Sequence, residues 1–227
     1  MTVSEAVTKV FGGIYHVTDE ALLRRIREHA SIQTFEKGEI IQRSGEMMEY
    51  ALFLLSGTVR CFFISGKGEE LTDCFISDFG YPAMTPDVNR PVFMTSEAVD
   101  RVELLAAPLK ELFRVMEEHT QMLWAYNQML SWSLLFHWQI KTSRVCFNGP
   151  ERYAWFRETF PEAEKVAYGK HIASFLGMTP ESLSRIRRTQ RDTDACPVMV
   201  EMKTEVSSDA LLEKMKNGFE AGKMDAR

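Results

Sequence analysis

Residues 170–188 read Lys-His-Ile-Ala-Ser-Phe-Leu-Gly-Met-Thr-Pro-Glu-Ser-Leu-Ser-Arg-Ile-Arg-Arg, and this stretch decides the fold of the C-terminal half. A short amphipathic run ends at Gly177, and a second helix is predicted to begin at Pro180 after a three-residue turn. Two helices joined by so short a glycine-containing turn must cross steeply, which is the helix-turn-helix arrangement. An ordinary helical hairpin on the protein surface is the alternative.

The second helix has clear start signals and two distinct faces. The hydroxyl of Thr179 can accept a backbone N–H as the N-cap, and Pro180 suits the first helical position. The polar face comprises Glu181, Ser184 and Arg185, and the apolar face comprises Leu183 and Ile186. One face can pack against the protein while the other reads base edges in a major groove.

Positive charge is concentrated around this helix although the chain as a whole is acidic, with a net charge of −5. Between Glu151 and Arg191 there are eight basic and five acidic residues, so this segment carries +3. Four of the basic residues lie between Arg185 and Arg191. Such a cluster on an acidic protein is typical of a phosphate-binding surface. A solvated helix end with basic residues near its C-terminus is the alternative.

Composition excludes several other classes. In 227 residues with 45% hydrophobic content, no run approaches the roughly 18 apolar residues of a membrane span, and no signal peptide is recognisable. The four cysteines are scattered without a Cys-x-x-Cys pair, which favours reduced thiols in the cytoplasm over a disulfide framework, a zinc site or an iron–sulfur sensor. Hydrolase, metalloprotease and Walker motifs are missing and the five histidines lie apart, so we do not expect an enzyme.

The first half of the sequence has the short period of β-strands. Apolar runs separated by glycine turns are predicted as strands near residues 35–41, 50–55, 58–64, 71–76 and 97–107, after a short helix at residues 19–29. Many short strands at this spacing indicate an antiparallel roll or barrel. Gly66-Lys67-Gly68 lacks the third glycine and the following helix of a phosphate loop, so a hairpin turn is predicted there.

A short helix at residues 109–117 is followed by about 28 residues, Thr120 to Phe147, without glycine or proline. This long helix is apolar on more than one face, so it needs partners on two sides. The strand domain is one partner, and the same helix of a second subunit is the other, as in a two-stranded coiled coil. A single buried core helix is the alternative. The expected dimer residues are Leu123, Leu130 and Leu134.

These features together resemble the CRP/FNR transcription regulators. Gly38-Glu39-Ile40-Ile41, Gly45-Glu46 and the run Tyr50–Val59 are similar to the β-roll signature of cyclic-nucleotide-binding domains. Glu151-Arg152-Tyr153 and residues 172–188 are similar to the family's winged helix. The resemblance covers about residues 15 to 191. It implies an α+β fold in which an antiparallel β-roll, of the cupin-like jelly-roll kind, is joined by a long dimerisation helix to a winged helix-turn-helix domain.

The resemblance also implies domains and partners. The expected domains are a roll at residues 1–117, a dimerisation helix at 118–149 and a DNA-binding domain with a C-terminal tail at 150–227. The expected partners are a second copy of the chain, double-stranded DNA and RNA polymerase, and a membrane is not expected. The family's base-contacting Glu and Arg match Glu181 and Arg185, and some members also use the residue matching Ser184. The full expected DNA-binding set is Lys170, Thr179, Glu181, Ser182, Ser184, Arg185, Arg187 and Arg188.

The chain departs from the family where cyclic AMP binds. Members that bind it carry Gly-Glu-Leu and, about ten residues later, Arg-Ser-Ala or Arg-Thr-Ala. Here Tyr81 stands in the acidic place, and Val92, Phe93 and Met94 stand where the arginine motif belongs. A cyclic phosphate needs a guanidinium and backbone donors in place of its water, and Val92 offers neither. Arg90 lies two positions away, so the expected effector pocket is Tyr81, Arg90, Val92 and Phe93.

We therefore expect control by a small effector other than cyclic AMP, with no certain cofactor and no metal. The competing hypothesis is an effector-sensing roll whose helical domain binds a protein partner instead of DNA. Beyond residue 191 the sequence predicts a wing strand at Cys196–Met202 and a weak helix at Asp209–Phe219.

Overall fold

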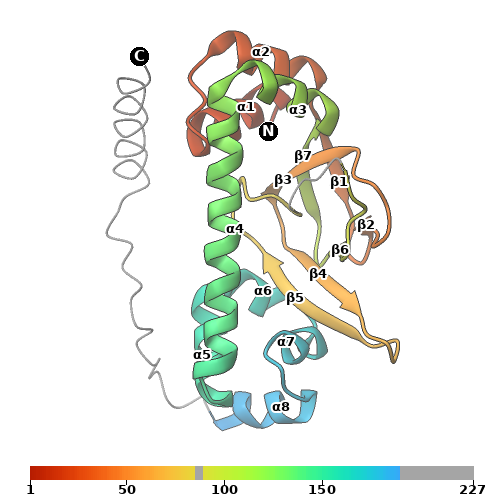
Figure 1. Ribbon diagram of the computed structural model, residues 1–227. Coiled ribbons are helices and arrows are strands. Elements are labelled where there is room, and N and C mark those ends of the chain that lie inside the picture. Colours follow the sequence, from red (N-terminus) through yellow and green to blue (C-terminus); the bar gives the residue numbers. More distant parts are fainter. Residues whose placement is uncertain (85–88, 190–227) are drawn as a thin grey trace, which may run out of the picture. The chain divides into compact units, whose positions relative to one another are not determined.

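The computed structural model describes residues 1–84 and 89–189 (Figure 1). Within these residues, seven strands form two antiparallel sheets, with strand orders β1-β7-β3 and β2-β6-β4-β5. The strands are β1 Ser31–Phe35, β2 Ile40–Gln42, β3 Tyr50–Ser56, β4 Val59–Ile64, β5 Glu70–Ile76, β6 Thr95–Ala98 and β7 Val102–Pro108. The predicted antiparallel roll is confirmed, because sequential strands cross between the two sheets rather than form one meander.

The turn from β3 to β4 requires a glycine at position 57. Gly57 has a φ of +88°, and a Cβ added there would lie 2.3 Å from the carbonyl oxygen of Arg101. Glycine has no Cβ and reaches this left-handed conformation freely. The backbone of the β6–β7 turn can therefore pack directly on the β3–β4 turn.

One strand prediction was wrong. Residues 97–107 were expected as a single strand, but the structure divides the segment between β6 and β7, which lie in different sheets. Between them, the amide of Val99 donates to the carbonyl of Thr58 (2.8 Å), and Asp100 Oδ1 accepts from the amide of Thr58 (2.7 Å). These bonds to a distant turn bend the chain, and residue-by-residue hydrophobicity does not reveal them.

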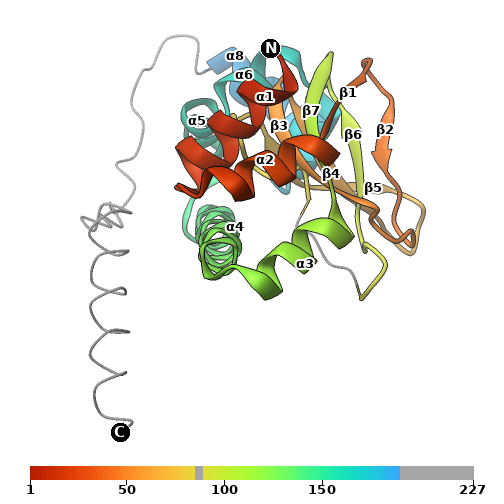
Figure 2. The ribbon, with the colours of Figure 1, turned by 90° about the horizontal axis from the view of Figure 1, so that it is seen from above.

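Helices that precede the strands in the sequence, and one that follows them, pack against the roll (Figure 2). The N-terminal ones are α1 Val3–Val7, the π-helix η1 Thr8–Ile14 and α2 Glu20–His29, and α3 is Leu109–Glu118. The α2 and α3 predictions are confirmed within one residue, whereas residues 3–14 had not been predicted as helical. Asp19 caps α2 by accepting from the amides of Ala21 and Leu22, and the ring of Phe11 lies 5.1 Å from that of Phe53 in β3.

Helix α4, Thr120–Cys146, leads from α3 to the helical part of the chain (Figure 1). One side of it packs on the protein through Met122, Ala125 and Met129, which are buried. The next helix begins at once after α4, because the Asn148 side chain and Glu151 form a capping box.

Between α4 and residue 189, where the described part of the chain ends, the helical part contains four short helices. They are α5 Gly149–Thr159, α6 Pro161–Val166, α7 Gly169–Phe175 and α8 Pro180–Thr189. Their core is a cluster of aromatic rings, Phe156, Phe160 and Phe175, which Phe75 of β5 joins with ring centroids 5.6–6.5 Å away. The helical part and the roll thus share apolar side chains. The predicted wing strand and the weak C-terminal helix lie outside the described residues.

Candidate nucleic-acid interface and effector pocket

The turn between α7 and α8 has the geometry that the sequence predicted. Gly177 has a φ of +64°, and the amide of Met178 donates to the carbonyl of Ala173 (3.0 Å), which closes the end of α7. Thr179 Oγ1 accepts from the amide of Ser182 (3.2 Å), as expected of an N-cap. The second helix therefore begins at a fixed place and in a fixed direction.

Helix α8 separates its side chains into a packed and an exposed face. Leu183 is 1% exposed and anchors the helix on the helical part. The exposed residues of α8 that belong to the predicted set are Glu181, Ser184, Arg185 and Arg188. Hydrogen bonds from its own amide and from the Thr179 hydroxyl lower the pKa of Glu181, so this side chain stays ionised at neutral pH. The outer face thus presents one acceptor, one hydroxyl and two guanidinium groups.

Two predicted residues have structural contacts instead. Nη2 of Arg187 donates to both carboxylate oxygens of Glu164 at 2.9 Å. Nε of Arg187 donates to the Tyr153 hydroxyl at 3.2 Å. These bonds tie Arg187 to α5 and α6 and draw it away from the outer face. The Ser182 hydroxyl is bonded to that of Thr179 within the cap (3.1 Å), whereas Lys170 is exposed at the start of α7.

Helix α7 rests on β5 of the roll. The amide of Thr72 donates to the Ser174 hydroxyl (3.0 Å), and the Arg144 side chain donates from α4 to the carbonyls of Phe175 and Thr72. His171 is buried beside Glu70 and Glu97, which both pair with the fully buried Arg60. Burial, reinforced by the charge of Arg60, lowers the pKa of His171 to about 4, so it is neutral at neutral pH.

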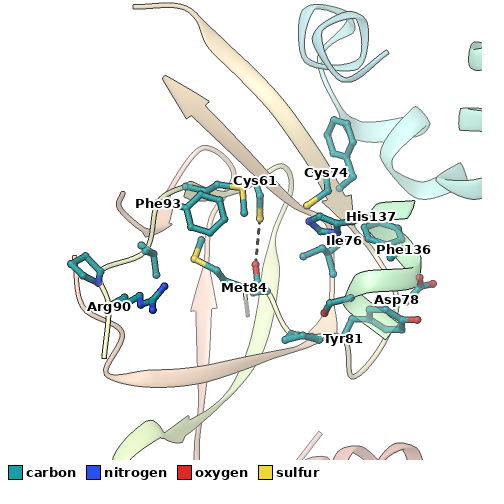
Figure 3. Close-up of a pocket in the computed structure, with 17 residues that line it drawn as sticks. Cys61, Cys74, Ile76, Asp78, Tyr81, Met84, Arg90, Phe93, Phe136 and His137 are labelled. Carbon is teal, nitrogen blue, oxygen red and sulfur yellow. Dashed lines mark hydrogen bonds between the residues drawn. The ribbon is translucent and has the colours of Figure 1, made fainter. Parts of the chain in front are cut away.

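A cavity of about 270 Å³ opens in the roll beside α4 (Figure 3). Its walls are mainly apolar, and strands β4 and β5, the segment between β5 and β6, and α4 all contribute. The lining residues are Cys61, Cys74, Phe75, Ile76, Asp78, Tyr81, Pro82, Ala83, Met84, Arg90, Pro91, Val92, Phe93, Met94, Ser133, Phe136 and His137.

All four predicted effector residues line this cavity. Val92 is buried, and its backbone is fixed by bonds with Glu46 (2.9 Å) and Gly45 (2.7 Å). Phe93 is 71% exposed at the mouth, where Arg90 is also exposed. The ring of Tyr81 stacks on Trp132 of α4 at 5.8 Å, and burial raises the pKa of this phenol.

The remaining polar and sulfur-containing wall residues were not predicted from the sequence. Cys61 and Cys74 are directly opposite each other on β4 and β5, although 13 positions apart in the numbering. Burial and the neighbouring Cys61 thiol raise the pKa of Cys74, with the thiol interaction as the larger cause. His137 of α4 also lines the cavity, with its Nε2 3.5 Å from Asp73 Oδ2. The strand register, which the sequence does not display, was the missing signal.

The three predicted dimer residues lie on the uncovered side of α4. Leu123, Leu130 and Leu134 are 52%, 38% and 60% exposed, and Trp138 and Val145 are exposed on the same helix. The alternative of a core helix buried all round does not fit these values. No helix among the described residues is long and apolar enough to cross a membrane.

Comparison with known proteins agrees with this architecture. Residues 32–119 match the model of the cyclic nucleotide-binding domain. A 107-residue stretch is 28% identical to the global nitrogen regulator of Synechocystis sp. and covers 46% of this chain and 48% of that protein. The chain thus spans about half the length of the curated relatives it matches.

Solved structures extend the likeness to the helical part. FixK2 from Bradyrhizobium japonicum has a TM-score of 0.64 at 17% identity, with 71% of this chain and 84% of that one covered. A protein described as a transcriptional regulator of the CRP/FNR family from Eubacterium rectale has a TM-score of 0.64 at 18% identity, with 78% and 86% covered. The Synechocystis relative is named as a regulator, and the Eubacterium rectale protein is described as one. The chain therefore matches the cyclic nucleotide-binding domain over residues 32–119 and has the fold of the CRP/FNR transcription regulators, which confirms the resemblance seen in its sequence.

Proposed function

We propose that the protein is a DNA-binding transcription regulator that acts as a homodimer and responds to a small effector other than cyclic AMP. The observation that carries this proposal is the outer face of α8, where Glu181, Ser184, Arg185 and Arg188 are exposed while Leu183 holds the helix in place. A helix anchored on one side and polar on the other is what major-groove reading requires.

The chemistry of this face suits base pairs and phosphates. A guanidinium such as that of Arg185 can bind the O6 and N7 of guanine with two hydrogen bonds, and the carboxylate of Glu181 can accept from the amino group of cytosine. These residues are four positions apart on one helix face, so they address neighbouring base pairs. Arg188, one turn further along, is suited to a phosphate contact.

The uncovered leucines of α4 support a dimer. Leu123, Leu130 and Leu134 recur along the exposed side of the helix and would be buried against the same helix of a second copy. A symmetric dimer reads a palindrome whose half-sites lie about one helical turn apart. A role in transcription further implies contact with RNA polymerase and a cytoplasmic location beside the DNA.

Cyclic AMP does not suit the cavity. Val92 is buried where the family's phosphate-binding arginine belongs, and its backbone amide is already bonded to the carbonyl of Glu46. The cavity wall at this place offers methyl groups instead of donors to a charged phosphate, whose loss of water is costly without them. Calorimetry with cyclic AMP is expected to show no binding at low-micromolar concentration. Low-micromolar affinity would contradict this and assign the phosphate to Arg90.

The decisive experiment is selection of a binding site from a pool of random DNA duplexes, followed by fluorescence anisotropy over a range of salt concentrations. We expect a palindromic consensus and an affinity that falls as salt rises, because phosphate contacts release counterions. Lys165→Ala is the matched control, since Lys165 is an exposed basic residue outside α8 whose side chain pairs with Glu162 on its own helix, α6. A protein that bound no duplex even at low salt would contradict the proposal and favour a protein partner for the helical part.

A further inference from the structure

Four sulfur-containing side chains line the roll cavity. Cys61 of β4 and Cys74 of β5 are register partners in an antiparallel pair, so their side chains point to the same face of the sheet. Both are buried free thiols, and both line the cavity (Figure 3). The pairing therefore places two thiols side by side in a protected, mainly apolar space.

Two thioethers complete this sulfur-rich wall. Met84 and Met94 are buried, at 8% and 7% exposure, and both line the same cavity. The Cys61 thiol donates to the carbonyl of Ala83 (3.4 Å), the residue next to Met84, so the segment that carries this thioether is in contact with Cys61. Figure 3 shows the side chains of Cys61, Cys74 and Met84 around one space.

This set of side chains differs from that of common metal sites. No three histidine, cysteine or acidic side chains converge on one point in residues 1–84 and 89–189, so those residues provide no tetrahedral zinc site. Thiolates and thioethers are soft ligands that select copper(I), an ion for which two thiolates suffice. We propose that Cys61 and Cys74 bind one soft monovalent metal ion of the copper(I) type, with Met84 as an additional thioether ligand.

Binding is an exchange of protons for a metal ion without electron transfer. The two thiols release their protons to water, two metal–sulfur bonds form, and the weak bond from Cys61 to the Ala83 carbonyl is given up. The apolar wall keeps water and external thiols away from the bound ion. A disulfide between the same residues would need an oxidant to remove two electrons, whereas the metal site needs none.

The site has a direct connection to the helical part. Cys74 is followed in β5 by Phe75, whose ring contacts Phe156 of α5 and Phe175 of α7. On the same strand, the amide of Thr72 is bonded to Ser174 of α7. A metal ion that draws Cys74 toward Cys61 therefore acts on the strand against which the helix-turn-helix rests. This regulatory consequence rests on the proposed function, but the binding of the ion does not.

The test uses the full-length reduced protein, titrated without oxygen against copper(I) held by a chromogenic chelator, with ascorbate as the reductant. We expect the protein to withdraw one ion per chain from the chelator. Cys61→Ser and Cys74→Ser should abolish this, and Met84→Leu should weaken it at unchanged stoichiometry. The matched control is Cys146→Ser combined with Cys196→Ser, which should retain one ion, because Cys146 is exposed at the end of α4, away from the cavity.

Retention of the ion by Cys61→Ser/Cys74→Ser, or its loss in the Cys146→Ser/Cys196→Ser control, would overturn the inference. If a pocket variant fails to fold, X-ray absorption of the copper-loaded wild-type protein decides, since only sulfur neighbours are expected and nitrogen or oxygen neighbours would refute the assignment. DNA binding is measured separately on metal-free and loaded protein. Metal binding without DNA binding would refute the proposed function alone, and DNA binding without metal binding would refute this site alone.

Discussion

The helix-turn-helix and the roll cavity differ in how far apart in the chain their residues lie. Helices α7 and α8 and their turn come from residues 169–189, whereas the cavity wall is drawn from residues between Cys61 and His137. The first region is determined by caps, a glycine and helical periodicity, all of which act over a few residues. The second depends on strand register, which long-range pairing sets. The contrast shows which kinds of site can be recognised in a sequence without a structure.

Helix α4 lines the cavity and contacts α7 through Arg144, and its uncovered side gives the largest expected effect. Leu130→Glu would place an unpaired charge in the proposed dimer interface, at a cost of about 3–5 kcal/mol, so the dimer should dissociate. Leu130 is 38% exposed in the single chain, and the monomer should therefore stay folded. Sedimentation at micromolar concentration measures the change. Ile64→Glu, an exposed apolar residue outside α4, is the control, and a wild-type monomer would refute the dimer.

Two glycines with positive φ, one in the helix-turn-helix and one in the roll, allow the same substitution to be tested in both regions. Gly177→Ala adds a Cβ that meets nothing closer than 3.5 Å, so it should cost only the left-handed strain of about 1–2 kcal/mol. Gly57→Ala adds a Cβ 2.3 Å from the Arg101 carbonyl, so packing strain is added and about 2–5 kcal/mol is expected. Urea unfolding measures both. Equal losses would show that the β3–β4 turn yields more easily than its packing indicates.

The arginines of α8 separate DNA reading from folding. Arg185→Ala should lose about 1–3 kcal/mol on the selected site and relax base preference, while Arg188→Ala should weaken all sequences alike. Arg187→Ala should lower the free energy of unfolding, because it breaks the bonds to Glu164 and Tyr153. Anisotropy with specific and random duplexes, together with urea unfolding, distinguishes the three. Unchanged discrimination by Arg185→Ala would mean that a different face of α8 reads the DNA.

His171 gives the smallest expected effect. Its pKa is lowered to about 4 in the folded protein from an ordinary 6.5, mainly by burial. The unfolded chain therefore takes up a proton first as the pH falls, and stability is lost between pH 6.5 and 4. Between pH 7 and 5, this histidine should lower the free energy of unfolding of the wild type by on the order of 1 kcal/mol, and His171→Gln should not show this decrease. Burial raises the pKa of nearby Glu97, and this carboxyl has the opposite effect on stability as the pH falls. Urea unfolding of variant and wild type is therefore compared at both pH values. Identical pH dependence would contradict the buried neutral histidine.

Particular residues show where prediction from sequence succeeds and fails. Thr179 as N-cap, Gly177 in the turn and Leu183 on the packed face were all predicted, because each follows from neighbours within one helical turn. Arg187 is indistinguishable from Arg188 in the sequence, and only the position of Glu164 on α6 gives the two side chains different contacts. The single strand expected over residues 97–107 failed for the same reason, since its interruption depends on the distant Thr58.

By itself, the sequence determined the antiparallel roll, the long helix and the helix-turn-helix, because apolar period and turn chemistry are local properties of the chain. It also excluded the arginine motif for cyclic AMP, because Val92 and Phe93 occupy the positions where that motif belongs. Only the tertiary structure decided that Cys61 faces Cys74, that His137 reaches the cavity and that α7 rests on β5. Those relations depend on strand register and on packing between distant segments, whose free energy is gained only when the whole chain has folded.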